Sequence, residues 1–140
     1  EMCSGIEYAG QMQLWKDPEV HLPVLLRDGS LKWLRWGERH GVQSPFFQGP
    51  CARLESIKEH KWDRFNPRAV KIPIDRYMER DQKNKPYWVK AKAGAVLQGL
   101  LATWGDEQRV YVVTTETPME FQHVQPRWPR ILEGAHAASD

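Results

Sequence analysis

The most distinctive chemistry in this chain of 140 residues belongs to a cysteine near its start. Cys3 follows Met2, which we expect to be the genetic start, so removal of Met2 would make Cys3 the amino-terminal residue. Its α-amine would then titrate at about 7.7–8.0 and its thiol at about 8.5. Such an amine forms a Schiff base with an aldehyde, and the adjacent thiol can close a thiazolidine ring on that imine. The alternative is that Cys3 is a small, buried hydrophobic residue.

The other metal-binding or redox residue types show no such pattern. Cys51 is the second of two cysteines, and two thiols cannot complete a zinc site alone. The five histidines are scattered, so we expect neither a metal nor another cofactor. A disulfide between Cys3 and Cys51 fits the count, but we do not expect it in a reducing compartment.

Positive charge and aromatic rings are interleaved along the middle of the sequence. The net charge is only +2, and the sequence pI is about 8.6. Cations next to flat rings suit single-stranded nucleic acid, because bases stack on the rings while phosphates are neutralised. The cations are Arg64, Arg68, Lys71, Arg76, Arg80, Lys83, Lys85, Lys90 and Lys92, and the rings are Trp62, Phe65, Tyr77, Tyr87 and Trp88. On composition alone, a solvated basic face over an aromatic core is the favoured interpretation.

Length and composition indicate one globular domain. The chain is 41% hydrophobic and 27% charged, with 11% aromatic residues, which argues against disorder. We expect a single domain over residues 1–133 and a flexible tail over residues 134–140. No stretch is apolar enough for a membrane span or a secretory signal, so we expect a cytoplasmic protein without membrane contact. We also expect a monomer.

The chemical residues must be held by elements that the sequence places along the chain. Periodicity predicts one main amphipathic helix over residues 53–65, ended by Asn66-Pro67. A capping box at Thr117–Glu120 predicts a short helix, and a loop follows over residues 123–129. Strands are predicted over residues 21–27, 30–36, 69–74, 76–80, 87–92, 96–103 and 109–115, with Asp28-Gly29 as a two-residue hairpin turn. The expected fold class is α+β: a strand-rich curled sheet or open β-barrel with one main helix.

Several short motifs occur in an order that resembles one known family. They are Met2-Cys3-Ser4-Gly5, Trp36-Gly37, Cys51-Ala52-Arg53-Leu54-Glu55-Ser56, Tyr77-Met78-Glu79-Arg80 and His123 through Arg127-Trp128-Pro129-Arg130-Ile131-Leu132. In this order the chain resembles the SOS-response-associated peptidase (SRAP) family, whose members form covalent crosslinks with abasic sites in DNA. The resemblance covers nearly the whole chain, although this chain is short for the family.

The resemblance implies roles for individual residues. Cys3 matches the cysteine that bonds the ring-opened abasic sugar, and Glu79 matches the acid that assists proton transfer at the imine. The implied DNA-binding residues are Arg53 and Arg127, which match two phosphate-holding arginines, together with Trp36 and Arg76.

Two further site positions depart from the family pattern. Cys51 stands where the family has asparagine, and a thiol is a poorer hydrogen-bonding group than an amide. Gln125 aligns with the family histidine, whereas His123 lies two residues earlier and would need a loop rearrangement to reach the site. Without the resemblance, His123 reads equally well as a surface histidine, and Glu79 as an exposed carboxylate paired with Arg76 or Arg80.

These observations lead to one main hypothesis and three alternatives. The main hypothesis is a protein that binds single-stranded DNA, captures abasic sites through Cys3 and processes its own N-terminus. One alternative is a thiol peptidase with Cys3, His123 and Glu79. Another is a catalytically impaired DNA-binding remnant, the kind of reduced, phage-related copy that a mobile element could carry. The last is a structural protein without affinity for DNA.

Overall fold

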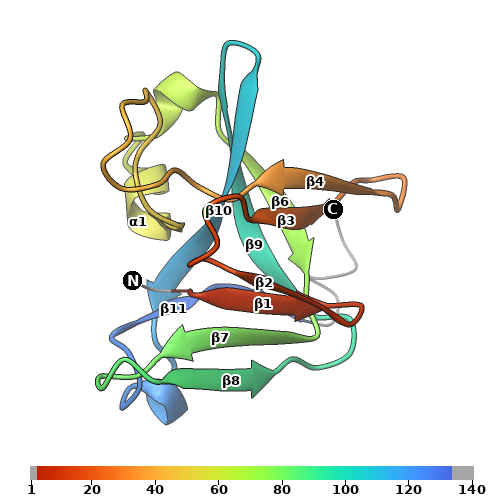
Figure 1. The fold of residues 1–140 in the computed structure, drawn as a ribbon, viewed down its shortest axis with the longest axis vertical. Coiled ribbons are helices and arrows are strands. Elements are labelled where there is room, and N and C mark those ends of the chain that lie inside the picture. Colours follow the sequence, from red (N-terminus) through yellow and green to blue (C-terminus); the bar gives the residue numbers. More distant parts are fainter. Residues whose placement is uncertain (1–2, 134–140) are drawn as a thin grey trace.

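The computed structural model describes residues 3–133, and the predicted tail over residues 134–140 lies outside them. The fold is mostly β, with 49% of residues in strands and 8% in helices, arranged as two sheets and one short α-helix. Figure 1 shows the smaller sheet below the larger one, with the tip of the β9–β10 hairpin of the larger sheet projecting at the top. The expected α+β class is therefore wrong, because sheet packing rather than a helix builds the core.

The smaller sheet is antiparallel throughout and has four strands in the order β2-β1-β7-β8. Their bounds are β1 (Gly5–Tyr8), β2 (Gln11–Leu14), β7 (Arg76–Arg80) and β8 (Pro86–Lys90). Ala9 and Gly10 join β1 to β2 with φ values of 52° and 78°. Two left-handed residues are typical of the tightest hairpin turn, but an alanine there gives little sequence signal, so neither strand was predicted.

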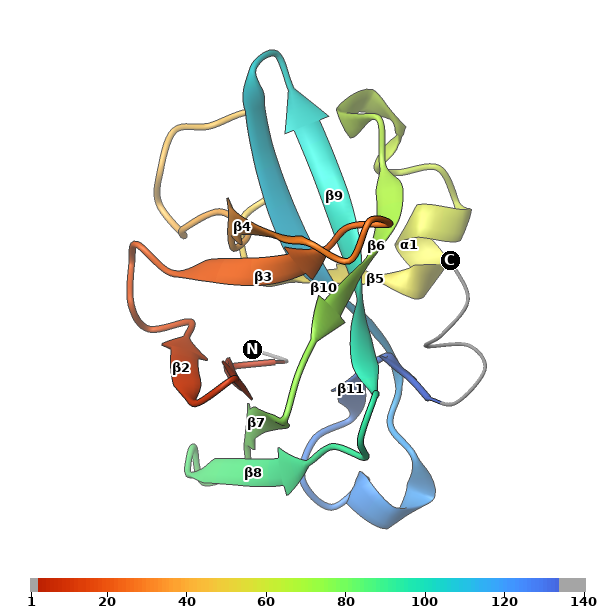
Figure 2. The same cartoon turned by 90° about the vertical axis from the view of Figure 1, so that its right-hand side faces the viewer.

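The larger sheet has eight strands along the path β11-β10-β9-β6-β3-β4, with β12 paired to β9 and β5 paired to β10. Their bounds are β3 (His21–Leu25), β4 (Leu31–Arg35), β5 (Cys51–Arg53), β6 (Arg68–Pro73), β9 (Val96–Trp104), β10 (Glu107–Glu116), β11 (Arg127–Pro129) and β12 (Ile131–Leu132). The sheet curls until a single bridge joins Trp36 to Val110. No ladder continues from that bridge, so the barrel is not closed (Figure 2).

The predicted main helix is replaced by two short pieces. The α-helix α1 spans only Leu54–Lys58, and the 3₁₀-helix η1 spans Asp63–Phe65. Between them His60 has a φ of 65°, which interrupts the helical path. None of the residues of α1 is buried, whereas Trp62 and Phe65 enter the core. The break lets these two rings turn inward, which a continuous helix would not allow.

The predicted hairpin turn and capping box also differ in detail. Leu26 and Ser30 close a three-residue loop, in which Gly29 takes the left-handed position with a φ of 87°. The short helix η2 spans Met119–Phe121 without a side-chain cap, because the Thr117 hydroxyl donates to the carbonyl of Gln125 instead. The seven predicted strands are confirmed as β3, β4, β6, β7, β8, β9 and β10.

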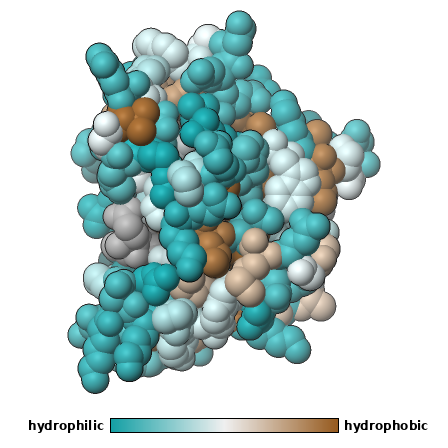
Figure 3. All heavy atoms as spheres, in the orientation of Figure 1, coloured by the Kyte–Doolittle hydropathy of each residue, from teal (hydrophilic) through white to brown (hydrophobic). Residues whose placement is uncertain are grey.

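Two hydrophobic clusters hold the fold together. One fills the space between the sheets and contains Cys3, Ile6, Tyr77 and Trp128. The other lies beneath α1 and η1 and includes Trp62, Phe65 and Tyr111. The face in Figure 3 is largely hydrophilic, with its apolar side chains in small, separate groups. Most of the large apolar side chains are therefore buried in the core rather than exposed on this face.

Candidate functional site

Cys3 and Glu79 are positioned by two neighbouring strands. Cys3 lies two residues before β1, which pairs with β7, and Gly5 lies opposite Met78. The amide of Ser4 extends the pairing by donating to the carbonyl of Met78 at 2.9 Å. Glu79 follows Met78 on β7, and the side chains of Cys3 and Glu79 are both 0% exposed. The strand pairing thus brings the two segments together, close enough for the charge of Glu79, when ionised, to raise the pKa of the Cys3 thiol.

Glu79 is a buried carboxyl group, and neither of its oxygens has a hydrogen-bonding partner among the described residues. Burial raises the pKa of Glu79 to about 9, so the group is protonated at neutral pH. The alternative of a surface carboxylate paired with Arg76 or Arg80 is wrong, because Arg76 pairs with Glu7 and Arg80 donates to the carbonyl of Asn84. A neutral carboxylic acid at this position can donate a proton.

The thiol of Cys3 is also held in its neutral form. Its Sγ lies 3.7 Å from the carbonyl oxygen of Gly5, and burial raises the pKa of the thiol well above its ordinary value. The negative charges of Glu79 and Cys51, when ionised, act in the same direction. Cys51 begins β5, is half-buried and packs against the cluster that contains Cys3. Cys3 and Cys51 are not joined in a disulfide.

A hydrogen bond between two aromatic side chains supports the strand that carries Glu79. Trp128 Nε1 donates to the hydroxyl of Tyr77 at 2.9 Å, and Phe121 stacks on Trp128 with a centroid separation of 4.7 Å. Burial, together with the nearby charges of Glu79 and Cys3 when ionised, raises the pKa of Tyr77 to about 12. The sequence reasoning missed this pair as a site component, although period-two alternation places Tyr77 and Glu79 on one face of β7.

His123 is not brought to Cys3. Its side chain is exposed and meets the ring of Tyr87 edge-on, with the ring centroids 6.2 Å apart. Within the described chain it forms no hydrogen bond or ion pair with Cys3 or Glu79. Gln125 is half-buried, and its amide donates to the carbonyl of Arg80 at the end of β7. Gln125 thus contacts β7, the strand that carries Glu79, whereas the His123 ring contacts Tyr87 on β8.

The residues implied to bind DNA differ in their availability. Arg53 is exposed. Arg127 is only 7% exposed and is held by Glu55. Arg76 pairs with Glu7 and stacks over Trp88. Trp36 is 1% exposed and donates its indole N–H to the carbonyl of Pro50, so it is a core residue and no base can stack on it.

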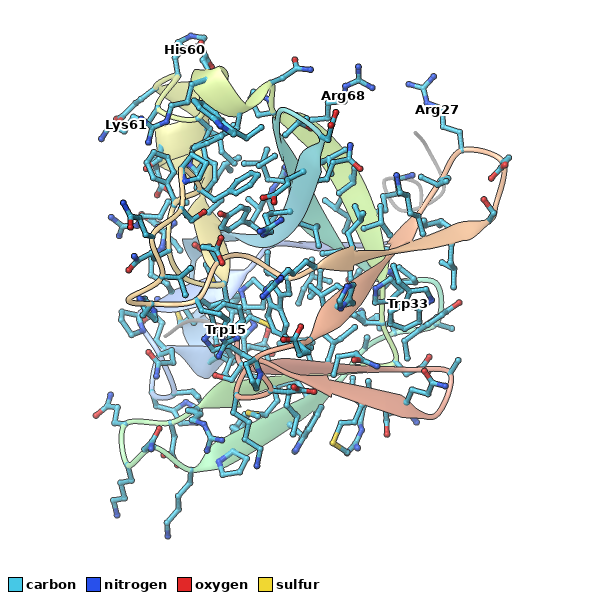
Figure 4. The ribbon with its side chains drawn as sticks, turned by 45° about the horizontal axis from the view of Figure 1, so that its top comes forward. Trp15, Arg27, Trp33, His60, Lys61 and Arg68 are labelled. Carbon is cyan, nitrogen blue, oxygen red and sulfur yellow. The ribbon has the colours of Figure 1, made fainter. Side chains whose placement is uncertain are left out.

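A pocket of about 240 Å³ opens at the end of the smaller sheet where Cys3 enters. Its lining comes from the segment after Cys3, the end of β2, the end of β7 with its following turn, and the loop at Gln125. The lining residues are Ser4, Leu14, Trp15, Lys16, Met78, Arg80, Asp81, Asn84 and Gln125. Trp15 is visible in Figure 4 near this end of the smaller sheet.

Comparisons with known proteins give no family assignment. No protein-family model matches the chain. No curated protein matches it either.

Among residues 3–133, no three or more His, Cys, Asp or Glu side chains are grouped so that they could hold a metal ion. The helices within this range are all too short or too polar to cross a membrane.

Proposed function

We propose that this protein binds single-stranded DNA and captures abasic sites covalently through Cys3, after the residues before Cys3 have been removed. The observation that carries the proposal is the position of Cys3 next to Glu79, a buried carboxyl group with no partner among the described residues. The resemblance to the SRAP family supports the same assignment. The amino group and the thiol would then face the aldehyde of a ring-opened abasic deoxyribose.

The chemistry proceeds in two steps, a condensation of the amine with the aldehyde and a ring-closing addition of the thiol. The free α-amine of Cys3 attacks the sugar aldehyde and forms a carbinolamine. Glu79 donates its proton to the departing hydroxyl, water leaves, and a protonated imine remains. The thiol of Cys3 then adds to the imine carbon, its proton returns to the Glu79 carboxylate, and the iminium nitrogen becomes the amine of a thiazolidine. One water is released, and no oxidant or metal is needed.

Removal of the N-terminal segment is part of the proposal. A thiol is a nucleophile for amide hydrolysis only as a thiolate, and burial disfavours that form of Cys3. We propose hydrolysis of the bond before Cys3 by the chain itself on the resemblance to the SRAP family alone, and the buried, neutral thiol argues against general peptidase activity. The exposed position of His123 also argues against a Cys–His peptidase centre.

The decisive experiment is incubation of the processed protein with a labelled single-stranded oligonucleotide that holds one abasic site. We expect a heat-stable adduct that disappears with Cys3→Ala and forms about 10²- to 10⁴-fold more slowly with Glu79→Gln. Mass spectrometry of the N-terminus establishes that Cys3 is the first residue. The matched control is protein that retains an extension before Cys3, which has no free amine on Cys3 and forms no thiazolidine. An adduct that survives Cys3→Ala contradicts the proposal.

The second candidate is a DNA-binding remnant without covalent chemistry. The observation in its favour is the full burial of Cys3 in the chain that still carries the residues before it. It predicts salt-sensitive binding that is equal for abasic and intact single strands and that is unchanged by Cys3→Ala. Preferential retention of abasic DNA by the processed protein excludes it.

A further inference from the structure

The pocket beside Ser4 has an apolar floor that a glycine makes room for. A Cβ atom on Gly5 would lie 2.8 Å from Cδ2 of Leu14 and 3.5 Å from Cε of Met78. The absence of a side chain at Gly5 lets Leu14 and Met78 close over the backbone of β1. Both of these side chains line the pocket, so its floor is apolar directly beside the segment that carries Cys3.

One wall of the pocket is fixed in place. The guanidinium of Arg39 lies 3.8 Å from the ring centroid of Trp15, and its Nη1 donates to the carbonyl of Trp15 at 2.6 Å. Trp15 also meets Trp36 edge-on at 5.4 Å. These contacts fix the position of the buried indole, so this wall of the pocket is preorganised.

The rim carries polar groups with unused bonding capacity. Lys16 is exposed and has no ion pair among the described residues. Arg80 uses Nη1 for the carbonyl of Asn84, which leaves most of its donors available. The amide of Gln125 donates to the carbonyl of Arg80, which leaves its own oxygen as an acceptor. The side-chain amide of Asn84 has no hydrogen bond within the described chain.

The acidic residue of the rim, Asp81, already accepts hydrogen bonds from the backbone of its own turn. Oδ1 of Asp81 accepts from the backbone amides of Lys83 and Lys85, both at 2.9 Å. These hydrogen bonds lower the pKa of Asp81, so it stays ionised as part of the turn. Asp81 therefore remains a negative charge that belongs to the turn, and the cations that could contact a ligand are Lys16 and Arg80.

We infer that this pocket holds one nucleotide of a single DNA strand, next to the position that Cys3 captures. The base lies over Leu14 and Met78, its polar edge meets the amides of Asn84 and Gln125, and its phosphate lies between Lys16 and Arg80. The volume of about 240 Å³ fits one ring system, below the roughly 300–1,000 Å³ of pockets for drug-sized ligands. The position of this nucleotide beside the captured abasic site rests on the proposed function, whereas nucleotide binding itself does not use the Cys3 thiol.

Photocrosslinking tests where the base lies. The probe is a single-stranded oligonucleotide containing 5-iododeoxyuridine, irradiated with the Cys3→Ala protein and analysed by peptide mass spectrometry. We expect the crosslink in the peptide that contains Trp15. A crosslink confined to Trp33 or Trp104, which are 41% and 47% exposed, overturns the inference. Figure 4 shows Trp15, which follows β2, well apart from Trp33 on β4, so the two outcomes are distinct.

Salt dependence tests the phosphate contact. For single strands, the slope of log K against log salt changes by about 0.7 for each phosphate neutralised. Lys16→Ala in the Cys3→Ala background should reduce that slope by about this amount and weaken binding at low salt. The matched control is Lys58→Ala, which removes the same charge from the exposed end of α1. Equal effects of the two substitutions contradict a specific contact at Lys16.

The two experiments separate this inference from the proposed function. A Trp15 crosslink in a protein that forms no abasic adduct supports the pocket and overturns the capture chemistry. Adduct formation with crosslinks elsewhere supports capture and overturns the pocket. Competition with free thymidine monophosphate distinguishes a mononucleotide site, which the monophosphate would clear, from a strand site, which only an oligonucleotide clears at comparable concentration. Displacement of the oligonucleotide by thymidine monophosphate at comparable concentration would overturn our assignment of the pocket to a DNA strand.

Discussion

Arg127 and Glu55 form a two-pronged ion pair between β11 and α1. Nη1 of Arg127 lies 2.8 Å from Oε2 of Glu55, and Nη2 lies 2.7 Å from Oε1. Nη2 also donates to the carbonyl of Thr114 at 3.0 Å. A carboxylate thus occupies the fork of donors that a phosphate would otherwise use. The arginine that the SRAP resemblance implies to be a DNA ligand has a partner within the chain.

Glu55→Gln is therefore expected to strengthen binding of single-stranded DNA. The substitution removes the carboxylate that competes with phosphate for Arg127, although the side chain keeps its size. Fluorescence anisotropy with an unmodified oligonucleotide measures the change. Glu59→Gln, on the exposed C-cap of α1, removes the same charge away from Arg127 and serves as the control. An equal gain with both variants would assign the effect to net charge alone and count against Arg127 as a phosphate ligand.

Glu79→Gln is expected to make protein stability less dependent on pH. Burial raises the pKa of Glu79 to about 9 in the folded protein, from 4.5 for the unperturbed group. Between these values the folded state keeps a proton that the unfolded state releases, so the free energy of unfolding falls as pH rises from 4.5 through 9. At 1.36 kcal/mol per pH unit, the loss between pH 4.5 and 7 is about 3 kcal/mol.

Urea unfolding at several pH values checks this prediction. Glutamine mimics the protonated acid, so the variant and the parent should be alike near pH 4.5 and diverge at higher pH, with the variant more stable. Parallel pH curves for the two proteins would show that Glu79 is ionised in the folded state. In that case its role as a proton donor in the proposed reaction fails as well.

Seven of the strands were predictable because their signals are local, whereas β1, β2, β5, β11 and β12 were not predicted. Runs such as Val110 to Val113 have the composition of a central strand, and β10 buries all four of these residues. The apolar spacing of residues 53–65 resembled a helix for a different reason. Trp62 and Phe65 are core residues, but they reach the core from a turn and η1 rather than from one helical face. Periodicity records which residues are buried, not the path of the backbone.

The candidate site was only partly predictable. Cys3 and Glu79 could be paired through the family resemblance, and strand pairing places them together. The status of Arg127 could not be predicted, because its partner Glu55 is 72 residues away in sequence. Nor could the burial of Trp36, since an exposed and a buried tryptophan look identical in a single sequence. Long-range contacts of this kind are set by sheet register, which local patterns do not encode.

The hydrogen bond between Trp128 and Tyr77 is expected to contribute to stability through satisfaction of a buried donor. Tyr77→Phe leaves the indole N–H of Trp128 without a partner in the core, which should cost about 1–3 kcal/mol. Trp128→Phe removes both the N–H and ring volume. In a double-mutant cycle followed by urea unfolding, the double variant should be more stable than the sum of the single losses predicts. Additive losses would mean that the two side chains are not energetically coupled.

Gly37→Ala is expected to be among the most damaging single substitutions in the larger sheet. Gly37 has a φ of 55°, and a Cβ there would lie 2.2 Å from the carbonyl oxygen of Gly49. That oxygen accepts from the amide of Glu38, so the backbone cannot move away without breaking a bridge. We expect Gly37→Ala to lower the free energy of unfolding, measured in urea, by more than about 4 kcal/mol.

Gly29→Ala is the matched control, because the φ of Gly29, 87°, is also left-handed but a Cβ there meets nothing within 4 Å. Backbone strain alone should cost that variant about 1–2 kcal/mol, and similar losses for both variants would contradict a steric role for Gly49.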